Sequence, residues 1–123
     1  MNAPNLRRLS NGEHVVLKRL LDDDFQGVGA LREQLGAIQV QSIDSEGSLK
    51  LQPEEGSPRA EVAQRVPVEA ELKDHDGFMI HVLLHVIDGL MDELEIYKEN
   101  LSAPQRDLDA KDLRVFASKE GPL

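Results

Sequence analysis

The sequence predicts an α+β domain in which two N-terminal helices pack on one face of a mainly antiparallel sheet of about five strands. Apolar residues recur at helical spacing before residue 36, alternating β-branched residues follow from residue 38, and three short turns end in glycine. A chain of 123 residues fits one domain, 1–123, with a single hydrophobic core. About 10–36 is expected to be helical, 38–98 to form the sheet and 99–123 to be a C-terminal tail.

Two helices are predicted at the N-terminal end. Ser10 and Glu13 form a capping-box pattern, which predicts a first helix over about 11–22. The second helix is expected to be capped by Asp24 and to end near Gly36. The apolar residues at helical spacing are Val16, Leu17, Leu20 and Leu21 in the first helix and Val28, Leu31, Leu35 and Ile38 in the second.

Five strands are predicted as a hairpin followed by a three-strand meander. The turns Asp44–Gly47, Asp74–Gly77 and Val86–Gly89 each end in a glycine suited to the left-handed residue of a three-residue hairpin loop. Between the second and third strands, Pro53–Arg65 is rich in Glu, Gly, Ser and Pro and is expected to be an exposed connection. The expected strands are about 38–43, 48–52, 66–73, 78–87 and 90–98.

The end of the chain carries a weaker pattern. Leu113, Val115 and Phe116 are expected to return to the body of the domain as a last short strand or helix. The polar segment 100–106 before them contains a proline and is expected to be irregular.

The register of the last hairpin can be predicted by comparing which side chains each possible turn length would place on the same face of the sheet. A two-residue turn would place Glu93 beside Leu84 and bury a carboxylate against apolar side chains. A three-residue loop instead pairs Val82 with Leu94, which places apolar side chains beside apolar side chains on one face. We therefore expect the three-residue loop and an apolar face covered by the helices. The centre of that face is expected to be Phe78, Ile80, Val82, Leu84 and Val86.

The opposite face is expected to be acidic, with histidines and apolar residues among the carboxylates. In the expected register, Glu71, His81 and Glu95 form one row across three neighbouring strands. One imidazole and two carboxylates could hold a divalent metal, although this spacing is not a specific metal signature. A solvated acidic face with a charge-compensating histidine is the simpler interpretation. The residues expected on this face are Glu69, Glu71, Lys73, Met79, His81, Leu83, His85, Met91, Glu93, Glu95 and Tyr97.

The amino-acid composition of the chain argues against several classes of function. Lys and Arg number 14 against 23 Asp and Glu, and the net charge of −9 argues against a nucleic-acid partner. The longest apolar stretch, 78–87, is too short to cross a bilayer, so no membrane association is expected. The sequence has no Cys, which excludes disulfides and thiolate chemistry and favours a reducing, cytoplasmic location. We find no motif for a nucleophile, a phosphate loop or a cofactor, so no catalytic residue and no cofactor is assigned.

Binding is the function that this pattern favours. Apolar anchors among charged residues are typical of interfaces, and an acidic surface would steer a basic protein partner. The expected binding surface comprises Glu69, Glu71, His81, Leu83, Glu93, Glu95 and Tyr97. One alternative is that the 53–65 connection or the C-terminal tail covers this face. Others are a homodimer formed through this face or through an edge strand, and a small enzyme or metal-binding protein that uses the Glu71, His81 and Glu95 row.

The stretch Val82–Gly89, followed by Glu93–Tyr97, resembles a hairpin of a family of small protein domains. It is similar to an "LLHV-x-DG … ELE-I-Y" hairpin found in a family of small bacterial domains of unknown function, most clearly over about 66–98. The resemblance implies a small helix-plus-meander domain of bacterial type and no established activity. In size and charge the chain is also similar to bacterial immunity proteins, which neutralise basic toxins.

Overall fold

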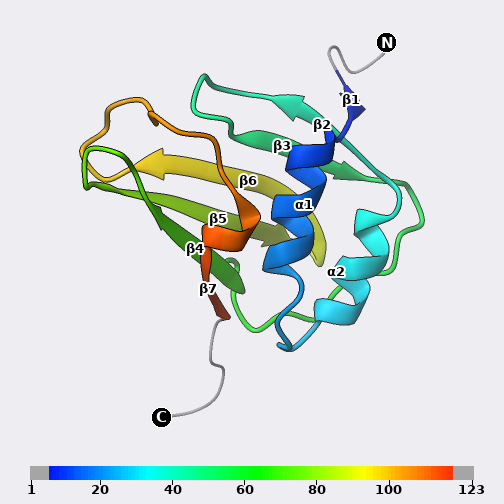
Figure 1. The fold of residues 1–123 in the computed structure, drawn as a ribbon. Coiled ribbons are helices and arrows are strands. Elements are labelled where there is room, and N and C mark those ends of the chain that lie inside the picture. The colour runs from blue at the N-terminus through cyan, green and yellow to red at the C-terminus, as the bar shows by residue number, and fades with distance from the viewer. Residues whose placement is uncertain (1–5, 118–123) are drawn as a thin grey trace.

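The computed structural model describes residues 6–117, in which two α-helices lie on one face of an open antiparallel sheet of seven strands (Figure 1). The strand order is β1-β2-β3-β6-β5-β4-β7. The helices are α1 (Asn11–Leu20), α2 (Val28–Leu35) and the short 3₁₀ helix η1 (Ala110–Asp112). The strands are β1 (Arg7–Arg8), β2 (Ile38–Ser42), β3 (Leu49–Pro53), β4 (Val68–Lys73), β5 (Met79–Ile87), β6 (Leu90–Lys98) and β7 (Arg114–Ala117). The α+β class is confirmed, and the expected number of about five strands is too low.

The two additional strands complete the edges of the sheet. β1 pairs with β2 through two residues, and β7 pairs with β4 through four. β7 and η1 both lie within the expected tail, and Leu113 between them is only 3% exposed. A two-residue strand shows no periodicity, so β1 is formed by its pairing with β2 and not by a local pattern.

α1 begins as its sequence predicts. The Ser10 hydroxyl accepts a hydrogen bond from the Glu13 N–H at 3.1 Å, and the Glu13 carboxylate accepts one from the Ser10 N–H at 2.9 Å. The guanidinium of Arg7 also donates to both carboxylate oxygens of Glu13, at 2.7 and 2.9 Å. The helix ends at Leu20, before the expected end, and the Arg32 side chain then donates to the carbonyl oxygen of Leu21 at 2.7 Å.

α2 has a different start from the one expected. Asp24 does not cap it, because the residue before the helix is Gly27, whose φ of +89° is left-handed. A Cβ at this glycine would lie 2.9 Å from Val62 Cγ1, so glycine lets the 54–65 connection pass close to the helix. The helix ends at Gly36 as expected, and Ile38 begins β2 instead of continuing the helix.

The β4–β5 hairpin has the expected register. Leu72 pairs with Ile80, and Ala70 pairs with Val82. The Asp74 N–H donates to the Phe78 carbonyl oxygen at 2.9 Å, which leaves a three-residue loop between them. Phe78 itself is 46% exposed and lies outside the core, contrary to expectation.

The β5–β6 hairpin contradicts the expected loop. Ile87 pairs with Leu90, so the turn contains only Asp88 and Gly89, which have φ values of +53° and +79°. This is the backbone of a type I′ turn, for which the Asp-Gly sequence is well suited. A β-bulge between His85 and Val86 then shifts the register within the hairpin.

The register beyond this bulge differs from the expected one by two residues. Leu84 pairs with Leu94, and Val82 pairs with Ile96. A shift of two keeps every residue on its expected face, except near the turn, where Met91 moves into the core and is 1% exposed.

The β2–β3 hairpin, in contrast, has a longer loop than the expected three residues. Ser42 pairs with Leu49, and the Ile43 N–H donates to the Ser48 carbonyl oxygen, so the loop spans 44–47. The Asp44 carboxylate holds this loop by accepting hydrogen bonds from the N–H groups of Glu46 and Ser48, at 2.9 and 3.0 Å.

One face of the sheet, the inner face, carries the core. Ile80, Val82 and Leu84 of β5 are completely buried, and the apolar residues of α1 pack over the same face. After β6 the chain crosses the helical side of the sheet to reach η1, which contacts α1 (Figure 1). No helix within 6–117 is long and apolar enough to span a membrane.

Candidate functional site

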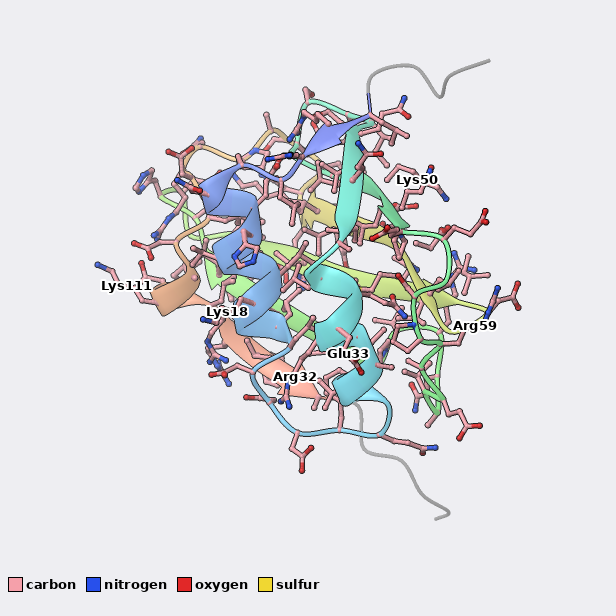
Figure 2. The ribbon with its side chains drawn as sticks, turned by 90° about the vertical axis from the view of Figure 1, so that its right-hand side faces the viewer. Lys18, Arg32, Glu33, Lys50, Arg59 and Lys111 are labelled. Atoms are coloured by element: carbon pink, nitrogen blue, oxygen red, sulfur yellow. The ribbon has the colours of Figure 1, made fainter. Side chains whose placement is uncertain are left out.

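The face of the sheet opposite α1 and α2, here called the outer face, holds the residues that the sequence singled out. Figure 2 shows the two sides: Lys18 of α1 and Lys111 of η1 project on the helical side, and Lys50 of β3 projects on the other. Strand alternation and pairing place on the outer face Glu69, Glu71, Lys73, Met79, His81, Leu83, His85, Glu93, Glu95 and Tyr97, together with Lys50, Arg114 and Phe116.

The described segments leave the centre of the outer face uncovered. The 54–65 connection passes around the β5–β6 turn, where Arg59 donates to the Asp88 carbonyl oxygen at 2.7 Å and the Ala60 N–H donates to that of Gly89 at 2.9 Å. From this connection, the Arg65 side chain reaches His85 on the outer face. The expected cover by residues 53–65 is therefore limited to one end of the face.

The expected row of Glu71, His81 and Glu95 is only partly formed. Glu71 pairs with His81 across the two strands, as predicted. The neighbour of His81 on β6 is Tyr97 and not Glu95, because the two-residue turn and the bulge each shift the register by one residue. The His81 and Tyr97 rings stack with their centroids 5.0 Å apart, and His81 Nε2 lies 2.8 Å from Glu99 Oε1.

Glu95 instead pairs with Leu83 and interacts with the other histidine of β5. His85 Nε2 lies 2.8 Å from Glu95 Oε1, and Arg65 Nε donates to His85 Nδ1 at 3.1 Å. Because an arginine can only donate, His85 Nδ1 must be the acceptor and the ring hydrogen must lie on Nε2. The contacts of His85 therefore fit a neutral ring that donates to Glu95.

The contacts of His85 also indicate whether this part of the outer face is suited to bind a metal ion. One potential ligand atom from each of His85, Glu93 and Glu95 lies within 4.8 Å of the others. A histidine that binds a metal ion normally donates its second ring N–H to an acceptor, whereas the second nitrogen of His85 accepts from the cationic Arg65. The arrangement favours a hydrogen-bond network of Arg65, His85 and Glu95 over a metal centre.

The outer face is less uniformly acidic than the sequence suggests. Lys50 lies 2.5 Å from Asp92, and Arg114 of β7 lies 3.5 Å from Glu71. Among the residues that the structure describes, Glu69 and Glu93 form no ion pair, so their charges are available. Lys50 and Arg114 come from the neighbouring strands β3 and β7, whose positions only the sheet order reveals.

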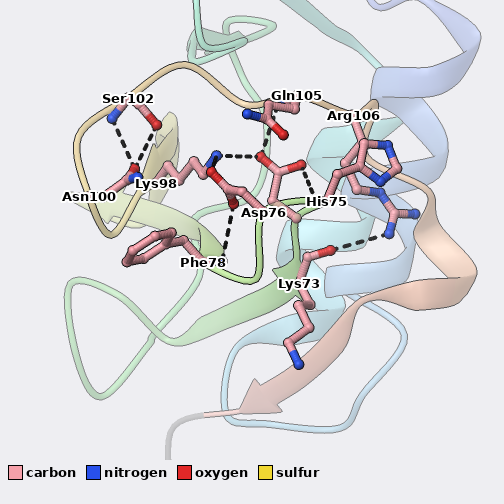
Figure 3. Close-up of polar contacts among 10 residues, drawn as sticks. Lys73, His75, Asp76, Phe78, Lys98, Asn100, Ser102, Gln105 and Arg106 are labelled. Atoms are coloured by element: carbon pink, nitrogen blue, oxygen red, sulfur yellow. Dashed lines mark hydrogen bonds and ion pairs between the residues drawn. The ribbon is translucent and has the colours of Figure 1, made fainter.

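A polar cluster that sequence reasoning missed lies at the end of β6 (Figure 3). The Lys98 side chain is fully buried, with its amino group 2.9 Å from Asp74 Oδ2 and 2.5 Å from Asp76 Oδ2. The Gln105 N–H also donates to Asp74 Oδ2 at 2.8 Å. The available signal was parity, because Lys98 follows Leu94 and Ile96 on the inner face of β6.

Hydrogen bonds lower the pKa of one carboxylate in this cluster and of one carboxylate elsewhere in the domain. Burial alone would raise the pKa of Asp74, but hydrogen bonds from Lys98 and from the Gln105 and His75 N–H groups outweigh it and lower the pKa to about 2. On the other side of the domain, hydrogen bonds from Arg7 lower the pKa of Glu13 to about 2. Both carboxylates therefore stay charged well below neutral pH.

These two pKa values predict where acid destabilises the fold. A carboxylate with a lowered folded pKa contributes stability above its unfolded pKa of about 4 and loses it as pH falls through the folded value. We expect the melting temperature to stay nearly constant from pH 7 to about 4.5 and to fall steeply toward pH 2. In Glu13→Gln the fall should be shallower, and equal slopes for the variant and the parent protein would contradict the assignment of Glu13.

The fold and this surface define a small α+β domain with a covered inner face and an open, charged outer face. The chain belongs to the family described as domain of unknown function DUF6984, which matches residues 6–106. The match contains both α-helices and β1 to β6, and it ends before η1 and β7. Comparison with curated proteins and with solved structures finds no match. The family assigns no activity, so a function has to be argued from the outer face.

Proposed function

We propose that this protein is a non-enzymatic binding module that engages a basic protein partner through the outer face of its sheet. The observation that carries the proposal is that α1, α2 and η1 all lie on the inner side, whereas exposed aromatic residues lie among the carboxylates of the outer face. Tyr97 is 38% exposed and Phe116 is 41% exposed. The proposed contact surface comprises Glu69, Glu71, His81, Leu83, Glu93, Glu95 and Tyr97.

The chemistry of this surface suits recognition. Aromatic side chains are frequent energetic anchors of interfaces, and unpaired carboxylates at Glu69 and Glu93 can accept Lys or Arg side chains of a partner. A negative surface also accelerates association with a basic protein at low ionic strength. The two histidine–glutamate pairs lie on an open face that excludes little water, so they favour binding over catalysis. The lack of cysteine and the resemblance to bacterial domains support a bacterial cytoplasm as the setting.

The experiment compares two variants of equal net charge. Glu69→Gln/Glu93→Gln removes two free carboxylates from the outer face, and Glu54→Gln/Glu55→Gln removes two exposed carboxylates from the connection. Partners are captured from a native lysate of the source cell at low and high salt, identified by mass spectrometry, then purified and measured by calorimetry. We expect a basic partner whose affinity falls at least about tenfold in the outer-face variant and with added salt.

The matched control decides how a loss of binding is interpreted. The connection variant should bind the purified partner within about twofold of the parent protein, because its charges lie away from the outer face. Equal losses in the two variants would show a non-specific effect of net charge. A captured partner that is acidic, or that binds both variants like the parent protein, would contradict the proposal.

A further inference from the structure

A groove lies beside the outer face, between the β2–β3 turn and the C-terminal half of β6. β3 pairs with β6 only at Leu49–Leu94 and Lys50–Glu93. Beyond these pairs, the Ser48 hydroxyl bridges the strands by accepting from the Ile96 N–H at 2.9 Å and donating to the Ile96 carbonyl oxygen at 3.2 Å. The resulting acidic groove has a volume of about 280 Å³ and is lined by Asp44, Glu46, Ser48, Glu93, Glu95, Ile96, Tyr97, Lys98, Leu101 and Ser102.

The charge of the acidic groove is one-sided. Four carboxylates line it, from Asp44, Glu46, Glu93 and Glu95. The one basic side chain in the lining is Lys98, and its amino group is buried in the pairs with two aspartates of the β4–β5 turn. Among the residues that line the groove, no cation is therefore free to neutralise the carboxylates, and the nearby Lys50 beside Glu93 forms an ion pair with Asp92.

A strained turn places an apolar side chain in the lining of the groove. Leu101 has a φ of +63°, a left-handed conformation that L-residues with large side chains rarely adopt, and it is 88% exposed. The turn is held by the Leu101 N–H donating to the Lys98 carbonyl oxygen, and by Asn100 Oδ1 accepting from Ser102 (Figure 3). Folding gains little from this exposed side chain, and backbone strain of this kind tends to occur at functional positions.

We infer that the acidic groove holds an extended basic segment of the partner, in which Lys or Arg residues alternate with apolar ones. The cationic side chains would pair with Glu46 and Glu93, and an apolar side chain would pack on Leu101 and Tyr97. Guanidinium groups form strong two-point hydrogen bonds with carboxylates, and a groove of this volume fits a few side chains and not a folded domain. This inference rests on the proposed function and locates the site at one end of the binding surface.

The first test uses an acetylated peptide of alternating Arg and Leu residues as the probe. Its binding to ¹⁵N-labelled protein at low salt should shift the amide signals of Glu46, Tyr97 and Leu101. We expect Glu46→Gln/Glu93→Gln to raise the Kd at least about tenfold, whereas Glu54→Gln/Glu55→Gln should stay within about twofold of the parent protein. Equal Kd values for these two variants would overturn the inference.

The second test separates a binding role of Leu101 from a structural one. Leu101→Asn removes the apolar side chain and keeps a residue that tolerates the left-handed conformation. The variant should melt no lower than the parent protein, and its Kd for the peptide should rise at least about threefold. An unchanged Kd would overturn the role of this residue as an anchor.

The pattern of signal shifts distinguishes this inference from the proposed function. Shifts confined to Glu69, Leu83 and Phe116 would overturn the groove site, while the outer face would remain the binding surface. A peptide that shifts no signal also overturns the groove site, and the capture experiment then decides the proposed function by itself.

Discussion

Lys98→Met is expected to lower the melting temperature by about 10 °C or more, because it removes the only cation from a buried cluster. The side chains of Lys98 and Asp74 are both fully buried, and Asp76 is the third member of the cluster. Methionine fills similar space but leaves a buried carboxylate without a counter-charge. Thermal unfolding monitored by circular dichroism at pH 7 measures the effect.

Two further variants test the cause of this loss. Lys73→Met changes an exposed lysine of β4 and should shift the melting temperature by about 2 °C at most. Adding Asp74→Asn to Lys98→Met should recover part of the loss, because the unpaired buried charge is then removed. The deficit of Lys98→Met should also narrow toward pH 5, since burial raises the pKa of Asp74 once Lys98 is absent. A Lys98→Met protein as stable as the parent would refute this account.

Gln34→Leu is expected to reduce the free energy of unfolding by about 2–4 kcal/mol. Gln34 of α2 is completely buried, and its amide makes three hydrogen bonds. The NH₂ group donates to the carbonyl oxygens of Pro58 at 2.7 Å and Gly89 at 2.8 Å, and the amide oxygen accepts from the Met91 N–H at 2.9 Å. One side chain thus links α2, the 54–65 connection and the β5–β6 turn.

Urea denaturation of this variant measures the loss, and an exposed glutamine supplies the control. Leucine has about the volume of the glutamine but leaves backbone groups without partners, so the cost comes from lost hydrogen bonds and not from a cavity. Gln64→Leu, at an exposed position of the connection, should change the unfolding free energy by less than about 0.5 kcal/mol. A similarly small change in Gln34→Leu would show that its hydrogen bonds contribute little.

The position of Glu95 shows how far the candidate site could be predicted. Its face is the expected one, because alternation along β6 follows from the strand pleat. Its neighbour on β5 differs from the expected one, because the two-residue turn and the bulge at His85 and Val86 together move β6 by two residues along β5. The interactions of Glu95 with His85 and of His81 with Glu99 and Tyr97 both depend on this register. The predicted Glu71, His81 and Glu95 row fails for the same reason.

The acidic groove could not be predicted from the sequence, because it too depends on which segments become neighbours in the sheet. It joins the β2–β3 turn to the end of β6, segments that are far apart in the sequence and become neighbours only through the pairing of β3 with β6. The left-handed conformation of Leu101 also depends on its surroundings, since leucine carries no local preference for it.

By itself, the sequence determined the α+β class, the start of α1 and the core-facing residues of the central strands. The start of α1 depends on a local contact, the capping side chain of Ser10. The core-facing residues follow from the alternation along β4 and β5, and a register shift of an even number of residues leaves each side chain on the same face. Only the tertiary structure decided the strand neighbours, the edge strand β1, the pairing of β7 with β4 and the burial of Lys98. Short strands and buried charges are stabilised by partners far along the chain. The two-residue turn and the bulge together change the partners of β6 by two residues, which leaves the alternation that the sequence displays unchanged.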